Sequence, residues 1–342
     1  MTGVARILVV QTAFIGDVIL TLPLLQSLKR AYPDAVIDCV AVPRAADVLR
    51  GHPAIDSVVV YDKRGADKGV RGFVRLCAAL RANRYDLAIV PHRSLRSALL
   101  VRLAGIPARI GFDRSAGSMF WTSVVRYQAD KHEIDRNLSL LMPLGIPVPA
   151  AEVPQIAPSA EDAAAVIASV PTITRKRIKV AIAPGTIWKT KQWPLAYVRT
   201  LCAALVHEGV DVLLVGGPED RSGCEEIRVG VASERVVNLA GKLTLRQSAE
   251  VLRRCRVVVS NDSAPMHLAG AVGTPVIAIF GATVPAFGFA PRGSRDRILE
   301  IGGLPCRPCS IHGGPSCPIG TFDCMMRIAP EQVLEQLRPF LS

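Results

Sequence analysis

The apolar residues of the chain gather in short runs, and longer segments of helical periodicity separate these runs. In the first half, the pattern predicts strands near 6–10, 36–41, 57–60, 86–90 and 107–112, and helices near 16–31, 70–83, 93–104 and 132–144. Strands that alternate with helices of this length are typical of βα units, in which the strands pair in parallel. We therefore expect an α/β fold built on parallel sheets.

A proline-rich stretch interrupts this pattern before it begins again. Residues 147–177 hold five prolines and one alanine-rich helical segment near 160–169, which suits a connection between domains. Beyond it, the pattern predicts strands near 179–183, 211–215, 236–239, 256–260 and 275–280, and helices from 194 to 208, from 219 onward, and near 244–254, 264–272 and 330–341. We predict two domains, 1–170 and 171–342, with a ligand in the cleft between them, since parallel sheets bind ligands at the carboxyl ends of their strands.

The charge balance indicates an anionic partner. The chain has 41 basic and 29 acidic residues, a formal net charge of +12. The segment from Arg93 to Arg126 holds six arginines against a single acid, and Arg93, Arg96 and Arg114 are our candidates for binding an anionic acceptor. Aromatic residues make up only 5% and no nucleic-acid-binding motif is present, so a phosphorylated acceptor or an anionic lipid surface fits better than nucleic acid. Charge alone is equally consistent with a solvated basic face.

The sequence does not predict a membrane span or a signal peptide. No apolar run reaches the roughly 18 residues that a bilayer span needs, and residues 1–25 do not form a signal peptide. We therefore predict a cytoplasmic protein. The apolar residues Met119-Phe120-Trp121, which lie among the arginines, suit peripheral contact with a membrane.

The first βα turn carries a carboxylate that suits proton transfer. The turn after the strand predicted at 6–10 has one glycine, Gly16, where a dinucleotide-binding fingerprint has three. Asp17 follows on the first turn of the next helix, where it faces the ligand edge of the sheet and is placed to act as a general base. Its alternative role is to stabilise the helix dipole, by about 0.3–1 kcal/mol.

In the second half, two polar loops follow predicted strands. The loop 183–194 carries Thr186, a hydroxyl donor, and Lys191, a point charge that suits a diphosphate. Glu219 follows the next strand and suits the hydroxyls of a ribose, or serves as an acid in the first turn of a helix.

A third polar turn, residues 260–267 (Ser-Asn-Asp-Ser-Ala-Pro-Met-His), lies between a predicted strand and an alanine-rich helix. Unpaired backbone N–H groups and the helix dipole make such a turn an anion site, and Asp262 or Ser263 can cap the helix. An ordinary capped βα turn has the same local features.

Four of the nine cysteines crowd into one loop rich in proline and glycine. They are Cys306, Cys309, Cys317 and Cys324, with the spacing C-x2-C-x7-C-x6-C. A reducing cytosol disfavours disulfides, and four neighbouring thiols are typical of a structural zinc or iron site. Only one C-x2-C pair is present where a zinc ribbon has two. We predict a structural metal here, and four unliganded thiols are the alternative.

Four motifs, in order and spread over nearly the whole chain, resemble those of the ADP-heptose:lipopolysaccharide heptosyltransferases, glycosyltransferase family nine. They are Ile15-Gly16-Asp17-Val18 with Thr21-Leu22-Pro23, Lys191-Gln192-Trp193-Pro194, Gly216-Gly217-Pro218-Glu219, and Asn261-Asp262-Ser263 with Met266-His267. The last motif is more similar to the enzyme that adds the second heptose than to the one that adds the first.

The resemblance implies a GT-B fold, with two facing Rossmann-like domains, a central cleft and no cofactor required for transfer. It implies ADP-L-glycero-β-D-manno-heptose as the donor, bound mainly by the second domain. The acceptor is then an inner-core lipid A oligosaccharide, bound by the first domain at the cytoplasmic face of the inner membrane. His132 and Glu133 are further candidates for contacts to this acceptor.

The resemblance also assigns roles by position. Asp17 matches the general base, and Lys191 matches a residue that stabilises the leaving diphosphate. The other donor contacts that it implies are Thr186, Glu219, Leu243, Asp262, Ser263, Ala264, Pro265 and His267. Pro265 departs from the family pattern of a backbone donor, because proline has no N–H.

Together these features predict an inverting glycosyltransferase that moves L-glycero-D-manno-heptose to the lipopolysaccharide inner core, with the second heptose favoured. A related GT-B transferase with a different sugar or a protein acceptor is one alternative, because acceptor specificity lies in loops of the first half. A metal-stapled basic module that binds nucleic acid is another. It explains the charge and the cysteines but gives Lys191, Glu219 and Asp262 no role.

Overall fold

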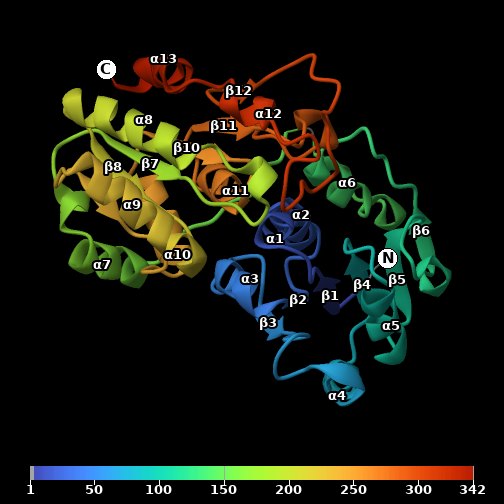
Figure 1. The fold of residues 1–342 in the computed structure, drawn as a ribbon. Coiled ribbons are helices and arrows are strands. Elements are labelled where there is room, and N and C mark those ends of the chain that lie inside the picture. The colour runs from blue at the N-terminus through green and yellow to red at the C-terminus, as the bar shows by residue number, and fades with distance from the viewer. Residues whose placement is uncertain (1–3, 150, 342) are drawn as a thin grey trace. The chain divides into compact units, whose positions relative to one another are not determined.

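The computed structural model describes residues 4–149 and 151–341 of the chain (Figure 1). They divide into two compact units, one that ends at Gln155 and one that begins at Ile156. Each unit carries a six-stranded sheet whose strands all pair in parallel, with helices beside it. The predicted α/β fold with two parallel sheets is confirmed.

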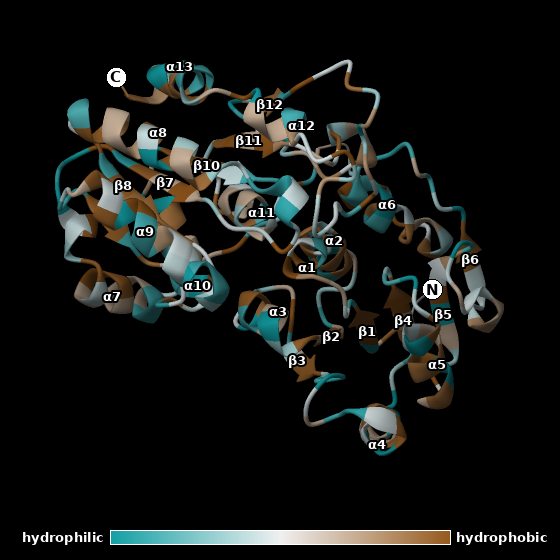
Figure 2. Cartoon of the chain, in the orientation of Figure 1, coloured by the Kyte–Doolittle hydropathy of each residue, from teal (hydrophilic) through white to brown (hydrophobic). Residues whose placement is uncertain are grey.

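The first sheet has the strand order β3-β2-β1-β4-β5-β6. Its strands are β1 (Arg6–Val10), β2 (Val36–Ala41), β3 (Ser57–Val60), β4 (Leu87–Val90), β5 (Ala108–Phe112) and β6 (Ser123–Val125). The helices of this unit are α1 (Ile15–Ile19), α2 (Leu22–Ala31), α3 (Pro43–Leu49), α4 (Gly69–Ala82), α5 (Leu95–Leu103) and α6 (Glu133–Ser139), with 3-10 turns η1 (Ser118–Phe120) and η2 (Met142–Leu144). The central strands are buried on both faces, which is why they are continuous apolar runs (Figure 2).

The helix predicted over 16–31 is in fact two helices. Leu20 ends α1, and α2 begins with Pro23 in its first turn. In the interior of one continuous helix, this proline would remove a backbone hydrogen bond and clash with the preceding turn, whereas the first turn of a new helix tolerates it. Asp17 therefore lies on a separate five-residue helix directly after β1.

The second sheet has the order β12-β11-β10-β7-β8-β9. Its strands are β7 (Lys179–Ala183), β8 (Asp211–Leu214), β9 (Val236–Asn238), β10 (Val257–Asn261), β11 (Val276–Phe280) and β12 (Arg297–Glu300). The helices are α7 (Ala160–Ser169), α8 (Leu195–His207), α9 (Arg221–Val231), α10 (Leu245–Arg253), α11 (Ala264–Ala271), α12 (Asp323–Met326) and α13 (Pro330–Leu341). Four 3-10 turns complete the unit: η3 (Pro171–Thr174), η4 (Lys189–Lys191), η5 (Pro218–Asp220) and η6 (Pro285–Phe287).

The division between the units precedes α7, a helix that the sequence analysis assigned to the first domain. Asp162 of α7 pairs with Arg246 of α10 at 2.9 Å. The N–H of Ile156 donates to the carbonyl of Ala271 at the end of α11. Residues 156–170 therefore fold with the second unit, because their contacts are to its helices.

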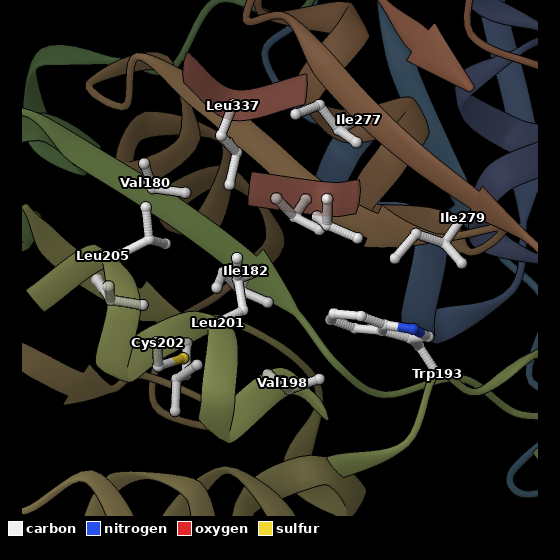
Figure 3. Packing of buried hydrophobic residues seen from close by; sticks show 14 of the residues in the cluster. Val180, Ile182, Trp193, Val198, Leu201, Cys202, Leu205, Ile277, Ile279 and Leu337 are labelled. Atoms are coloured by element: carbon white, nitrogen blue, oxygen red, sulfur yellow. The ribbon is translucent and has the colours of Figure 1, made fainter. Parts of the chain in front are cut away.

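Trp193 anchors the loop that follows β7 in the core of the second unit. Its side chain is buried together with aliphatic side chains of β7, α8 and β11 (Figure 3). The indole N–H donates to the carbonyl of Ile328 at 2.9 Å, and the ring meets Tyr197 edge-on at 5.9 Å. Because a buried indole needs such a partner, Trp193 holds the preceding residues in one position.

The two sheets have the same topology. In each, the first strand of the unit lies between its second and its fourth, so the strand order reverses between β1 and β4 and again between β7 and β10. In sheets of this kind, ligands bind outside the carboxyl ends of the strands at the reversal. The loops there carry Asp17 after β1, Arg93 after β4, Lys191 after β7 and Asp262 after β10.

Candidate functional site

The strongest single contact at the reversal in the second unit joins two residues that the sequence analysis selected. Lys191 Nζ lies 2.6 Å from Asp262 Oδ2, and the two side chains are only 13% and 10% exposed. Thr283, just after β11, donates its hydroxyl to the same carboxylate oxygen at 2.7 Å. The ammonium group is thus fixed above the end of β10. The role of Thr283 was missed, although a polar residue directly after a predicted strand was a usable signal.

Asn261 holds the loop that carries Thr186 and Lys191. Its amide N–H donates to the carbonyl of Pro184 at 2.9 Å, and its carbonyl oxygen accepts from the N–H of Trp193 at 3.1 Å. The buried amide thereby joins both ends of the loop to the end of β10. Lys191 owes its position to this bridge as well as to its own ion pair.

The start of α11 differs from the prediction. Ser263 is the N-cap residue, but its hydroxyl donates to the carbonyl of Asn261 at 3.3 Å and makes no cap bond to the helix. The Asp262 carboxylate is engaged by Lys191 instead. The prediction that either residue caps the helix is therefore wrong. The Ser263 side chain thus makes no cap bond at an end that the helix dipole makes positive.

The remaining positions of the fourth motif occupy the first turns of α11. Pro265 lies in the first turn next to Ala264, where a helix does not need the missing N–H. His267 is buried on the same helix. An anion at this end would meet backbone amides and the Lys191 ammonium together.

The other predicted donor residues lie at the same edge of the sheet. Thr186 is half-buried in the loop after β7, and Glu219 is exposed in η5 after β8. Leu243 is half-buried just before Thr244, which caps α10. The carboxylate of Asp220 lies against Gly185, where an added Cβ would come within 1.9 Å of it. A larger residue at this position would have to displace the Asp220 carboxylate, so the loop after β7 lies close against η5.

In the first unit, Asp17 lies at the reversal, and hydrogen bonds at the start of α1 hold it. The N–H of Phe14 donates to Asp17 Oδ2 at 3.2 Å, which is the helix-start role considered above. Thr21 donates its hydroxyl to the Asp17 carbonyl at 2.8 Å. The carboxylate therefore has a fixed orientation at the carboxyl end of β1.

A cluster of charged and aromatic side chains lies within electrostatic range of Asp17. Glu133 is buried and pairs with Arg136 at 2.9 Å. The guanidinium of Arg136 lies 5.1 Å from the ring centre of Tyr127, and that of Arg93 lies 4.2 Å from it. Burial raises the pKa of Glu133, and the nearby charge of Asp17 raises it further. The sequence analysis selected Arg93 and Glu133 but missed Tyr127 and Arg136, although the i, i+3 spacing of Glu133 and Arg136 on one helix was a signal.

The three arginines proposed to bind the acceptor have separate environments. Arg93 belongs to the cluster around Tyr127. Arg96 lies against the rings of Tyr61 and Phe73, and Arg114 is exposed after β5. The structure thus brings only Arg93 into the neighbourhood of Asp17, while Arg96 and Arg114 follow the ends of β4 and β5 at the same edge of the sheet.

His92 joins the ends of β1 and β4 through hydrogen bonds between its imidazole and uncharged hydroxyl groups. Its Nδ1 lies 3.0 Å from the hydroxyl oxygen of Thr12 and 2.9 Å from that of Ser97. Burial, and to a lesser extent the charges of Lys63 and Arg93, lower its pKa from 6.5 to about 4. The imidazole is therefore uncharged at neutral pH and serves as a hydrogen-bonding support beneath the Arg93 loop.

This shift predicts how acid destabilises the protein. The unfolded chain takes up a proton at His92 near pH 6.5, whereas the folded chain resists until about pH 4. The stability from neutral His92 is thus complete above pH 6.5 and is lost between pH 6.5 and 4, up to about 3 kcal/mol. We expect His92→Gln to lose less stability than the wild type over this range, measured as urea midpoints. Exposed His207→Gln is the control, and equal losses in both variants would contradict the assignment.

The four-cysteine loop does not have the predicted metal-ligand arrangement. Within residues 4–149 and 151–341, no group of three or more His, Cys, Asp or Glu side chains is placed to hold a metal ion. The thiols are near enough for Cys306 and Cys317 to influence the pKa of Cys309, which burial raises. Backbone N–H groups, first that of Phe322, lower the pKa of Cys317. As placed, these residues do not fit a zinc or iron centre.

The same loop has a clear structural link to the donor side of the second unit. The N–H of Gly314 donates to the Thr190 hydroxyl at 2.7 Å, and that hydroxyl donates to the Gly314 carbonyl at 3.0 Å. Arg307 donates to the carbonyl of Thr283 at 2.8 Å. The cysteine-rich loop therefore supports both Lys191, through its neighbour Thr190, and Asp262, through Thr283.

The fold and these two strand-end sites define a protein built from two Rossmann-like units of the GT-B class. Residues 73–313 match the model of glycosyltransferase family 9 (heptosyltransferase), which is more than half of the chain. The chain belongs to this family and is a glycosyltransferase.

Individual relatives agree with this assignment. Lipopolysaccharide heptosyltransferase 2 of Salmonella typhimurium is 28% identical over 98% of this chain and 99% of its own length. Lipopolysaccharide heptosyltransferase 3 of Escherichia coli is 32% identical over 79% of this chain and 82% of its own length. The solved structure of E. coli ADP-heptose lps heptosyltransferase II is 26% identical, with a TM-score of 0.81 over 98% of both chains.

Proposed function

We propose that this glycosyltransferase moves L-glycero-D-manno-heptose from ADP-heptose to the inner core of lipopolysaccharide, with inversion at the anomeric carbon. The observation that carries the proposal is the Lys191–Asp262 pair at the sheet reversal of the second unit, next to the start of α11, where Ser263 makes no side-chain cap bond. Relatives of nearly full length named lipopolysaccharide heptosyltransferase 2 support the second heptose as the one added.

The second unit binds the donor. Lys191 and the first amides of α11 take the diphosphate, because both present positive charge at the carboxyl ends of β7 and β10. Asp262, fixed by Lys191 and Thr283, contacts the heptose hydroxyls. The remaining donor contacts are Thr186, Glu219, Leu243, Ser263, Ala264, Pro265 and His267.

The first unit supplies the base and the acceptor contacts. Asp17 takes the proton of the acceptor hydroxyl as that oxygen attacks the anomeric carbon from the face opposite ADP, and the bond to the diphosphate breaks. Lys191 stabilises the charge that develops on the leaving group. Arg93, Arg96 and Arg114 bind acidic groups of the phosphorylated lipid A-core acceptor, as guanidinium groups bind phosphate and carboxylate. No step of this scheme needs a metal, and the four-cysteine loop has a supporting role.

The acceptor is a lipid, so the enzyme works at the cytoplasmic face of the inner membrane. In the described part of the chain, no helix is long and apolar enough to cross a bilayer. Of the three apolar residues predicted to contact a membrane, Met119 in η1 is strongly exposed. The prediction is wrong for Trp121, which is buried and donates its indole N–H to the carbonyl of Phe112. The exposed Met119 and the positive charge around it support a peripheral contact with the membrane.

An acceptor panel tests the function. Purified enzyme is incubated with ADP-heptose and with core acceptors that end before the first heptose, after the first, and after the second, and mass spectrometry follows the product. We expect one heptose to be added to the acceptor that ends in the first heptose. Transfer only to the heptose-free core would move the proposal to the first heptose. No use of ADP-heptose, with turnover of another nucleotide sugar, would overturn it.

A further inference from the structure

A second cationic pocket lies at the opposite edge of the second sheet from Lys191. Its volume is about 620 Å³, and it is open to solvent. Its lining residues are Arg175, Lys176, Arg177, Ser233, Glu234 and Arg235. The segment 175–177 leads into β7 and 233–235 leads into β9, so the pocket lies at the amino ends of these strands. It is therefore separate from the residues assigned to the donor.

A buried carboxylate lies behind the pocket. Asp211, at the start of β8, is fully buried, and neither of its carboxylate oxygens has a hydrogen-bond partner in the structure. The Nη1 atoms of Arg175 and Arg177 are each 3.9 Å from Asp211 Oδ1. Because a buried ionised group needs compensating charge, Asp211 keeps both guanidinium groups at this edge. Their side chains are still 40% and 47% exposed, which leaves them accessible to a ligand.

Hydrogen bonds fix the backbone and the third arginine of the pocket. Lys179, buried in β7, donates from Nζ to the carbonyls of Arg175 and Arg177 at 2.5 and 3.1 Å. Arg235 donates from Nη1 to the carbonyl of Val206 near the end of α8 at 3.0 Å. Lys179 thus holds the backbone that carries Arg175 and Arg177, and the carbonyl of Val206 holds the Arg235 guanidinium group without an acid.

The charges of the pocket do not balance. Arg175, Lys176, Arg177, Arg235 and the neighbouring Lys179 supply five positive charges, and Glu234 and Asp211 supply two negative ones, which leaves an excess of three. Guanidinium groups bind phosphate oxygens in a bidentate manner, and several of them around one cavity suit a ligand with more than one negative charge.

We propose that this pocket binds a phosphorylated ligand through Arg175, Arg177 and Arg235, independently of the donor site. The phosphate groups belong either to a soluble polyphosphorylated compound or to the headgroup of an anionic phospholipid. Both present the same oxyanions to the same side chains, and the experiment separates the two sources.

The test measures two probes with the full-length protein, once without ADP and once with ADP at a concentration that just saturates the donor site, so that binding at the donor site is told apart from binding at the pocket. The soluble probe is myo-inositol hexakisphosphate, titrated by calorimetry. The membrane probe is sedimentation with vesicles of phosphatidylglycerol, compared with vesicles of phosphatidylcholine. We expect the double variant Arg175→Ala/Arg177→Ala to weaken binding of one probe by about tenfold or more. The control, Arg295→Ala/Arg338→Ala, removes the same charge from exposed positions that do not line the pocket.

The double variant leaves the buried Asp211 carboxylate without its arginines and can therefore destabilise the fold. A second variant keeps the test decisive in that case. Glu234→Gln leaves both arginines in place and removes the acid that lines the pocket, so it should tighten binding by about two- to fivefold. Exposed Glu335→Gln is its control. Effects on the soluble probe identify a soluble ligand, and effects on the phosphatidylglycerol vesicles alone identify a lipid headgroup. If the wild type binds neither probe, or if the pocket variants behave as their controls do, the proposal is overturned.

Discussion

Replacement of Asp17 by asparagine is expected to reduce the rate of heptose transfer by about 10²–10⁴-fold, the usual contribution of a general base. The amide of asparagine cannot accept the proton of the acceptor hydroxyl at neutral pH. It keeps the shape of the side chain, and its carbonyl oxygen can still accept the hydrogen bond from the N–H of Phe14. The short helix α1 should therefore remain intact, and the loss should fall on kcat.

Three measurements separate this chemical role from a structural one. Affinity for ADP, measured by calorimetry, should match the wild type, because the residues assigned to ADP all lie in the second unit. The thermal midpoint should change little. Asp34→Asn, an exposed position with the same chemical change, should leave kcat unaltered. Near-normal turnover by the Asp17 variant would limit that carboxylate to its observed contact at the start of α1.

The sheet of each unit was predictable because its central strands are buried on both faces. Continuous apolar runs such as Leu87–Val90 and Val257–Val259, which alternate with segments of helical periodicity, are typical of strands in the middle of a parallel sheet. The elements that were missed are short and lie at the edges, such as β6 and β12, where a strand is exposed and its pattern is weak. Helix α3 was missed as well, since it begins with Pro43, and a proline there was not used as a start signal.

The sequence predicts which residues of the site follow the end of a strand, but it does not predict how these residues contact one another. Lys191 and Asp262 follow β7 and β10, and parallel topology alone brings such loops to one edge. Their ion pair, and the link from Thr190 to Gly314 over 124 positions, depend on how the loops pack. Local rules failed at Asp262: a carboxylate before a helix predicts a cap, but the nearby ammonium group binds it more strongly.

Replacement of Lys191 by alanine is expected to have the second large effect, on both turnover and the affinity for ADP. We expect kcat to fall by about 10²–10³-fold, as when a donor to a developing negative charge is removed. Affinity for ADP should fall as well, because the ammonium group lies beside the Asp262 carboxylate, directly before the N-cap residue of α11. Lys189→Ala is the matched control: Lys189 is exposed in the same turn, η4, and its loss should leave both quantities near the wild-type values.

The variant removes two interactions at once, and a double-mutant cycle with Asp262 separates them. Lys191→Ala leaves a nearly buried carboxylate that keeps the Thr283 hydroxyl as a donor. Repulsion between this carboxylate and the diphosphate is therefore a second source of the defect. If this repulsion dominates, Asp262→Asn in the Lys191→Ala background restores the affinity for ADP. If Lys191 binds the diphosphate itself, the double variant stays as weak as Lys191→Ala. We expect the second result, because neutralising Asp262 restores no cation to the site, and a restored affinity would reduce Lys191 to a counter-charge for Asp262.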